Sequence, residues 1–290
     1  MTSPARPLLL TVARLAETRS RALVLQFGGA AGTLASLGDQ GLAVSQALAE
    51  DLDLALPNLP WHSHRDGLAE VATTLGLLTG TLGKIGRDLT LAMSTEVGEL
   101  FEPAAAGRGG SSAMPHKRNP VGSVVVQAAA LRVPGLVATL LTSMVQEHER
   151  AVGGWHAEWE TLPQIAELAA GALAHIEEIL SGLDVDAGRM TANLNLTRGL
   201  VMAEAVTLAL GERIGRPAAY ALVEQGSRKA IAEGLHLHEA LAADAEVTAH
   251  LDSAALDRLF QPHGYLGASA AFIDRALAGM RTIAVGVGFE

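Results

Sequence analysis

The side chains that could do chemistry gather in one short segment, from residue 108 to residue 120. It reads Arg-Gly-Gly-Ser-Ser-Ala-Met-Pro-His-Lys-Arg-Asn-Pro. The glycines allow the backbone to bend tightly and to approach a ligand closely. Lys117 and Arg118 supply positive charge, and Ser111 and Ser112 are hydrogen-bond donors or weak bases beside it. This set suits a carboxylate substrate whose neighbouring carbon exchanges a proton, because amides and cations can stabilise a serine alkoxide.

The end of this segment predicts the start of a helix. Asn119 would be the N-cap residue and Pro120 the first helical residue. A helix N-terminus carries unpaired N–H groups and a partial positive charge, which attract an anion. Taken residue by residue, the same string also fits a flexible glycine-serine loop, a capping asparagine and two solvated cations.

The string 110–120 matches Gly-Ser-Ser-x-x-Pro-x-Lys-x-Asn-Pro, the signature of the fumarase/aspartase superfamily, which this chain resembles. The resemblance implies an all-α fold of long bundled helices and a homotetramer whose active sites are built from several subunits. It also implies β-elimination or its reverse, without a cofactor, through a carbanion that an adjacent carboxylate stabilises.

The resemblance also assigns roles to individual residues of the string. Ser111 matches the serine that acts as catalytic base and acid. Lys117 and Asn119 match the ligands of the substrate carboxylates. Ser112 and Met114 complete the expected substrate-binding set, with Met114 in a mobile loop.

Further stretches resemble the 3-carboxy-cis,cis-muconate cycloisomerase family of this superfamily, over residues 23 to 277. These stretches are Val24–Thr33, Pro60–Asp66, Gln146–Arg150, Trp155–Pro163 and Tyr265–Gly267. The resemblance implies lactonisation, in which one carboxylate of a small tricarboxylate adds across a double bond to give 4-carboxymuconolactone, in the β-ketoadipate route of aromatic acid breakdown. Arg150 falls where lyase relatives carry a substrate-anion arginine. A lyase that releases fumarate from adenylosuccinate-like or argininosuccinate-like substrates is the alternative.

Two departures from the superfamily pattern bear on activity. Lyases and fumarases often carry a glutamate five residues after the signature asparagine, where this chain has Val124. The histidine-bearing segments that should precede residue 23 are replaced by a short, different lead-in, residues 1–22. The N-terminal domain is therefore predicted to be absent, and His116 does not match the usual histidine partner by position. A non-catalytic helical scaffold is the second alternative.

The composition limits the classes of partner. Hydrophobic residues make up 49% of the 290 residues and aromatic residues 3%, which favours packed helices over a β-sandwich. The net charge of −10 argues against a nucleic-acid partner. The chain has no cysteine, and its start is too short and too soon interrupted by Arg14 for a secretory signal, which fits the cytoplasm. The apolar stretch 121–145 predicts a helix buried on all sides in an oligomeric bundle rather than a membrane span.

The hydrophobic periodicity predicts long helices and two domains. One seam of apolar residues at helical spacing runs through Leu68, Val71, Leu75, Leu78, Leu82, Ile85 and Leu89. A second runs through Ile165, Leu168, Ala172, Ile176, Ile179 and Leu183. Four glycines on the first helix, at 76, 80, 83 and 86, predict close helix–helix approach. A third helix is expected over 200–212, and a break at 185–197 would separate a bundle domain, 23–190, from a smaller helical domain, 191–290.

Other residues admit a functional and a structural interpretation. Gly28, Gly29 and Gly32 lack the spacing of a nucleotide-binding loop, and a tight loop between bundle helices is favoured. His62 and His64 lack a third ligand at a sensible spacing, so no metal is expected. Structural roles are favoured for His148 and His156, and Trp155 and Trp159, four residues apart, are expected to pack on one helix face.

Overall fold

The computed structural model describes residues 5–104, 109–110, 113–114 and 116–286. The chain divides into two compact units. Unit 1 comprises Met1–Ser94, Leu100–Asp184 and Ala276–Glu290, and unit 2 comprises Thr95–Glu99 and Val185–Arg275. The helices of the first half are α1 (Ala5–Ala22), η1 (Ala35–Gln40), α2 (Gly41–Asp51), α3 (Asp66–Ala92), α4 (Val121–Ser143) and α5 (Gly154–Ser181). Two short strands, β1 (Leu100–Phe101) and β2 (Asp184–Val185), pair with each other.

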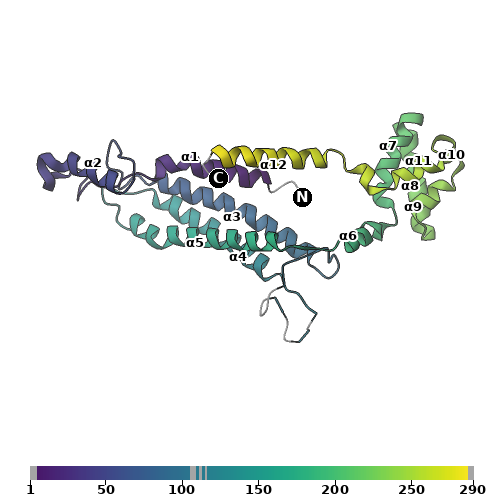
Figure 1. Ribbon diagram of the computed structural model, residues 1–290, viewed down its shortest axis with the longest axis horizontal. Coiled ribbons are helices and arrows are strands. Elements are labelled where there is room, and N and C mark those ends of the chain that lie inside the picture. The colour runs from purple at the N-terminus through teal and green to yellow at the C-terminus, as the bar shows by residue number, and fades with distance from the viewer. Residues whose placement is uncertain (1–4, 105–108, 111–112, 115, 287–290) are drawn as a thin grey trace. The chain divides into compact units, whose positions relative to one another are not determined.

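Three long helices, α3, α4 and α5, form the bundle of unit 1 and lie alongside one another (Figure 1). The first predicted seam lies inside α3, and the second lies inside α5 except for Leu183, because α5 ends at Ser181. Along α3 the side chains of Leu78, Leu82, Ile85 and Leu89 are buried, and along α5 those of Ile165, Ala172, Ile176 and Ile179 are buried. The all-α fold predicted from the periodicity is therefore confirmed.

Glycines on α3 let α4 approach closely at three of the four predicted positions. A Cβ on Gly83 would lie 2.5 Å from the Cβ of Ala130, and one on Gly86 would lie 3.1 Å from the Ser123 carbonyl oxygen. A Cβ on Gly76 would lie 3.2 Å from a methyl carbon of Val137. The prediction is wrong for Gly80 within this chain, because nothing lies within 4 Å of its Cβ position. These contacts also establish that α3 and α4 run antiparallel.

Helix α4 is apolar all round but is covered on one face only. By length and composition it is the one described helix that could cross a membrane, although Val126, Val133 and Leu140 pack inside the bundle. The opposite face leaves Leu131 83% exposed and Val124 exposed as well. Burial on all sides, as expected from the sequence, is therefore not found within this chain.

Helix α1 packs against the start of α3. Arg21 forms an ion pair with Glu70, and the hydroxyl of Thr18 donates to the same carboxylate at 3.1 Å. The neighbouring position on α3 is Gly67, where a Cβ would lie 3.0 Å from the Arg21 carbonyl oxygen. The lead-in 1–22 thus contributes a helix to the bundle from residue 5 onward.

Unit 2 is a cluster of short helices around an aliphatic core. Its helices are α6 (Ala187–Leu194), η2 (Asn195–Thr197), η3 (Leu200–Met202), α7 (Ala203–Ile214), α8 (Arg216–Glu233), α9 (Leu237–Ala242), α10 (Ala245–His250), α11 (Ser253–Leu259) and η4 (Pro262–Tyr265). Val206, Leu210, Leu237, Leu241 and Leu256 form its core. The helix expected over 200–212 is found as η3 followed by α7. The last helix, α12 (Ser269–Gly286), belongs to unit 2 up to Arg275 and to unit 1 from Ala276 onward.

Candidate active site

The loop that precedes α4 is closed by Asn119. The Asn119 backbone N–H donates to the Gly109 carbonyl at 2.8 Å, and its side-chain Nδ2 donates to the same oxygen at 3.1 Å. Gly109 has φ 71°, a left-handed conformation that glycine adopts without strain. The Lys117 N–H donates to the Met114 carbonyl at 3.0 Å, which forms a turn inside the loop. The predicted catalytic Ser111 and the predicted substrate ligand Ser112 lie outside the described residues.

The N-cap prediction for Asn119 is wrong. Helix α4 begins at Val121, and the Asn119 amide donates back into the loop instead of accepting from a helix N–H. The capping acceptor is Glu102, whose carboxylate accepts from Gly122 N at 3.0 Å and from Ser123 N at 2.7 Å. Glu102 is 7% exposed. The N-terminus of α4 is therefore filled by a carboxylate of the same chain and is not open to a substrate anion.

Arg118 also interacts with other residues of the same chain. Its guanidinium donates to the Asp184 carboxylate at 2.8 Å and to the Glu102 carbonyl at 2.6 Å. It lies 4.6 Å from the centre of the Phe101 ring, a cation–π distance. Part of the positive charge that Arg118 brings to the loop is therefore balanced by Asp184.

Lys117 and Asn119 line one small cavity. Its volume is about 160 Å³, and its wall also contains Gly109, Gly110, Glu102 and Met93. Within the described residues, no carboxylate lies within ion-pair distance of the Lys117 ammonium. A cation without a carboxylate partner beside a cavity can bind an anion. The predicted pairing of Lys117 with Asn119 thus has a geometric basis.

Arg150 lies in the connection between α4 and α5, residues 144–153, which we call the Arg150 loop. His148 and Ala151, on either side of Arg150, have φ angles of 48° and 49°. Ser63, just before α3, donates through its hydroxyl to the His148 carbonyl at 2.5 Å. The Arg150 side chain is exposed, and no carboxylate lies within ion-pair distance of it in the described part of the chain.

Aromatic rings from two segments contact one another beside the Arg150 loop. Trp155 and Trp159 pack edge-on at 5.2 Å between centroids, as their spacing on one helix face predicts. The His62 ring meets Trp155 at 4.6 Å, and its Nε2 is buried without a hydrogen-bond partner in the described structure. Burial lowers the pKa of His62 below its usual value, and the positive charge of Arg150 lowers it further. His62 is therefore held in its neutral form near Arg150.

The two groups of candidate residues lie at opposite ends of the bundle. Lys117 and Asn119 precede α4, whereas Arg150 follows it (Figure 1). Helix α4 has 23 residues, and at about 1.5 Å per residue it is roughly 34 Å long. One chain therefore does not bring Arg150 to Lys117 and Asn119.

The remaining candidates are the two histidines before α3 and the glycines after α1. No group of three His, Asp or Glu side chains that could hold a metal occurs among the described residues, so His62 and His64 form no such site there. The glycines at 28, 29 and 32 form a tight loop after α1. A Cβ on Gly28 would lie 2.9 Å from Pro60, so this loop also approaches another segment closely.

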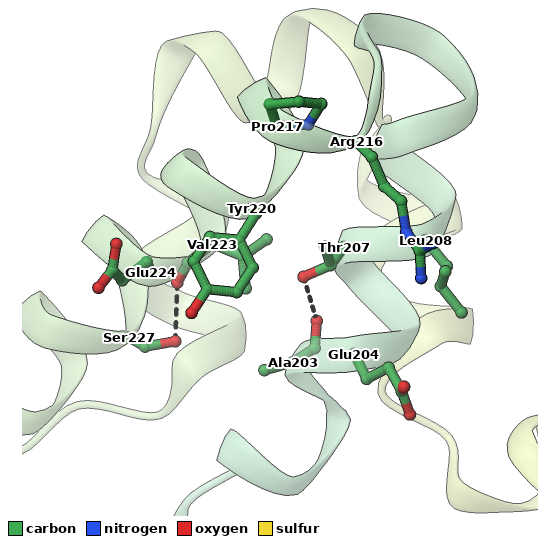
Figure 2. A pocket seen from close by; sticks show the side chains of 10 residues that line it. All are labelled: Ala203, Glu204, Thr207, Leu208, Arg216, Pro217, Tyr220, Val223, Glu224 and Ser227. Atoms are coloured by element: carbon green, nitrogen blue, oxygen red, sulfur yellow. Dashed lines mark hydrogen bonds between the residues drawn. The ribbon is translucent and has the colours of Figure 1, made fainter.

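A larger cavity lies in unit 2, and its lining contains none of the predicted site residues. It has a volume of about 730 Å³ between α7 and α8, and Figure 2 shows the side chains around it. Arg216 is its cation, but the carboxylates of Glu204 and Glu224 line the same space. A substrate with several negative charges would be repelled there. This cavity is therefore a poor candidate for a tricarboxylate.

Comparison with known proteins decides the family. The protein family described as lyase matches residues 4–135, and the family described as adenylosuccinate lyase C-terminus matches residues 199–276. A curated relative from Pseudomonas aeruginosa, 3-carboxy-cis,cis-muconate cycloisomerase, is 60% identical over 265 residues. The chain belongs to the fumarase/aspartase superfamily of lyases. That alignment covers 91% of the chain and 58% of the relative, so the chain spans little more than half of this superfamily member.

Solved structures of superfamily members agree with this assignment. The crystal structure of the 3-carboxy-cis,cis-muconate lactonizing enzyme from Pseudomonas putida superposes with a TM-score of 0.90 at 50% identity, covering 96% of this chain and 61% of that one. A fumarate lyase from Mesorhizobium sp. BNC1 superposes with a TM-score of 0.84 at 39% identity, covering 94% and 62%. The bundle described above is thus the bundle of this superfamily.

Some residues of the site region could not be found by sequence motifs. Ser63, Arg65 and Glu158 fall in stretches that resemble the family, but nothing in their types marks them as contacts of the Arg150 loop. Arg65 and Glu158 are 93 residues apart and form a buried ion pair at 2.6 Å. Glu102, the cap of α4, is likewise some twenty residues from the amides that it accepts from.

Proposed function

We propose that the protein is a 3-carboxy-cis,cis-muconate cycloisomerase, which converts this tricarboxylate into 4-carboxymuconolactone in the cytoplasm. The observation that carries the proposal is the signature loop. Lys117, which has no carboxylate partner in the described structure, lies with Asn119 on a cavity that Gly110 also lines, and Gly110 precedes Ser111 in the sequence. The names of the relatives from Pseudomonas aeruginosa and Pseudomonas putida support the choice of substrate.

The proposed reaction is an intramolecular addition that loses no atoms. A carboxylate oxygen of the substrate attacks one carbon of a double bond, and the electron pair moves to the neighbouring carbon. A carboxylate attached to that carbon stabilises the resulting carbanion. Ser111 then delivers a proton to the carbanion, and in the reverse direction it removes the proton. Ser112 and Met114 complete the substrate-binding set.

Cations and amides supply the stabilisation that the carbanion needs. Lys117, Asn119 and Arg150 hold the carboxylates and balance the charge that develops on the adjacent carboxylate. Arg118 lines the same cavity, but it is not counted among the substrate ligands, because its guanidinium already donates to Asp184 and to the Glu102 carbonyl. Val124 stands where related lyases often carry a glutamate, which favours cyclisation over a reaction that needs a positioned water.

The active site is proposed to form between copies of the chain, in a homotetramer. Within one chain, the two candidate groups are separated by the length of α4. The apolar face of α4 that includes Leu131 and Val124 is exposed and would be buried by other copies. A composite site would bring Arg150 of one copy to Lys117 and Asn119 of another.

Replacement of the proposed proton-transfer residue tests the function. We expect Ser111→Ala to lower kcat by roughly a hundred- to ten-thousand-fold, because general acid–base catalysis contributes about that much. The assay follows the loss of the conjugated diene absorbance of 3-carboxy-cis,cis-muconate, with the lactone identified as product. Ser20→Ala is the matched control, since its exposed hydroxyl bonds only to the Glu17 carbonyl on α1.

Full turnover by the folded Ser111→Ala protein would contradict the assigned role. The match of residues 199–276 to the adenylosuccinate lyase C-terminus supports one second candidate, a lyase that releases fumarate. Fumarate release from adenylosuccinate, with no change in the muconate absorbance, would favour that candidate. An inert protein in both assays would favour the non-catalytic scaffold.

A further inference from the structure

The Arg150 loop adopts a backbone conformation that its sequence does not favour. His148 and Ala151 are both left-handed although neither is glycine, and side chains with a Cβ rarely take this conformation. Such residues persist only where the surrounding structure determines their conformation, and they gather at ligand-binding segments. Arg150 lies between the two, and Ala151 is only 1% exposed. The loop is therefore held in place by contacts outside itself.

The first such contact comes from the segment before α3. The Ser63 hydroxyl donates to the carbonyl of His148 at 2.5 Å, so it fixes the peptide group that precedes Glu149 and Arg150. Ser63 is buried, which protects this hydrogen bond from water. The bond joins residues 85 positions apart and is directed at the strained part of the loop.

The second contact is a buried ion pair between the same segment and α5. The Arg65 Nε and Nη2 atoms lie 2.9 and 2.6 Å from the two oxygens of Glu158, a bidentate arrangement. The side chains are 9% and 5% exposed. Gln146, at the start of the loop, donates to the same carboxylate at 3.4 Å and to the Ser143 carbonyl at 2.9 Å. The ion pair therefore connects α3, α5 and the loop.

A buried ion pair contributes little to stability compared with apolar residues of the same volume, because both charges must be desolvated. Its bidentate geometry instead fixes the relative orientation of the elements that it joins. Here those elements flank an exposed arginine that lacks a carboxylate partner within the described part of the chain. Such a network of contacts can fix the orientation of Arg150.

We propose that Ser63, Arg65 and Glu158 are positioning residues that hold the Arg150 loop, so that the Arg150 guanidinium meets a substrate carboxylate in one fixed direction. The inference rests on the proposed function for the identity of the substrate. None of the three residues touches the reacting atoms. They act through Arg150, since binding through a fixed guanidinium avoids the entropy cost of ordering the loop on binding.

Ser63→Ala tests the proposal with the smallest change, the loss of one hydroxyl. The first readout, amide hydrogen exchange over residues 147–153, does not depend on activity. We expect exchange to accelerate about ten-fold in this loop, as for the loss of one buried hydrogen bond, with little change elsewhere in the bundle. Ser94→Ala is the matched control, because its hydroxyl donates to the Leu91 carbonyl at the other end of α3.

The second readout separates positioning from a general structural role. We expect Ser63→Ala to raise KM about ten-fold with a smaller effect on kcat, since substrate anchoring is weakened rather than proton transfer. In an Arg150→Ala background, Ser63→Ala should have no further effect on KM, because the residue that it positions is gone. Glu158→Gln, which keeps the shape but not the charge, should behave as Ser63→Ala does.

An unchanged rate of amide exchange in the Arg150 loop of Ser63→Ala would overturn the proposal. This outcome can be read even if the Glu158→Gln variant fails to fold. Equal KM effects of Ser63→Ala with and without Arg150 would overturn it as well. If the unaltered protein does not turn over 3-carboxy-cis,cis-muconate, the proposed function is contradicted, but the proposal about the Arg150 loop is not. Faster exchange in the loop would still support its fixation by Ser63, and the KM readout would move to the substrate then identified.

Discussion

At the scale of single residues, the pairing of charges decides which cations can meet an anion. Arg118 is engaged by Asp184, and Arg65 by Glu158. Lys117 and Arg150 have no carboxylate within ion-pair distance in the described residues. The sequence alone does not distinguish these four cations from one another. Their ion pairs in the folded chain show that two of them have structural roles, whereas the other two are proposed to bind substrate.

The lowered pKa of His62 predicts how acid affects stability. In the unfolded chain this imidazole binds a proton near its usual pKa of about 6.5, whereas in the folded chain burial, Arg150 and Arg65 oppose protonation more than Glu158 favours it. The unfolded state therefore binds more protons just below that pH. Stability contributed by neutral His62 is present above it and is lost as pH falls toward the lowered folded pKa.

We expect the melting temperature to fall between about pH 7.5 and about pH 5.5, and to fall less in His62→Gln than in the unaltered protein. Ser20→Ala, at an exposed position of α1, serves as the control for the substitution itself, because it removes no titratable group. Identical pH profiles of the unaltered protein and His62→Gln would refute the assignment of a neutral, buried imidazole. Differential scanning calorimetry at both pH values provides the measurement.

At the scale of elements, periodicity predicts helices well because it is local. The seams of α3 and α5 follow from spacings of three and four residues, and four side chains of each predicted seam are buried. The start of α4 was predicted wrongly, since the residue that caps it, Glu102, is distant in the sequence. Gly80 was also predicted wrongly, because the direction in which two helices cross decides which glycines meet the neighbour.

The glycines of α3 offer a matched pair of substitutions. We expect Gly83→Ala to destabilise unit 1, since the new methyl group would overlap Ala130 and overpacking costs about 1–3 kcal/mol. This exceeds the gain in helix propensity of about 1 kcal/mol. Gly80→Ala meets nothing within 4 Å and should stabilise the helix by up to about 1 kcal/mol. Thermal melts of both variants check the signs, and a stabilising Gly83→Ala would contradict the close contact.

At the scale of the whole molecule, the candidate site is divided between the two ends of a bundle. A motif in the sequence can place Lys117 and Asn119 in one loop, as the signature does. No motif can state that Arg150 lies a full helix length away within the same chain. The proposal of a composite site therefore needs the positions of both loops on the bundle, and it is consistent with the exposed apolar face of α4.

A mixture of two impaired variants tests the composite site. Ser111→Ala should be inactive and Arg150→Ala should keep only weak turnover with a raised KM, but copies mixed, dissociated and reassembled should regain turnover at low substrate concentration. If copies associate at random, about a quarter of the mixed sites would combine an intact Ser111 with an intact Arg150. Turnover in the mixture, compared with each variant alone at equal total concentration, provides the measurement. A mixture no more active than its components would contradict a site shared between copies.

The length of α4 sets the distance between the two groups of candidate site residues within one chain. Each residue added to a helix lengthens it by about 1.5 Å and turns its far end by about 100°. A single insertion in α4 would therefore change both the separation of Lys117 from Arg150 and the relative direction in which they point. The proposed site should therefore tolerate substitutions of exposed residues on α4 better than a change in the residue count of the helix.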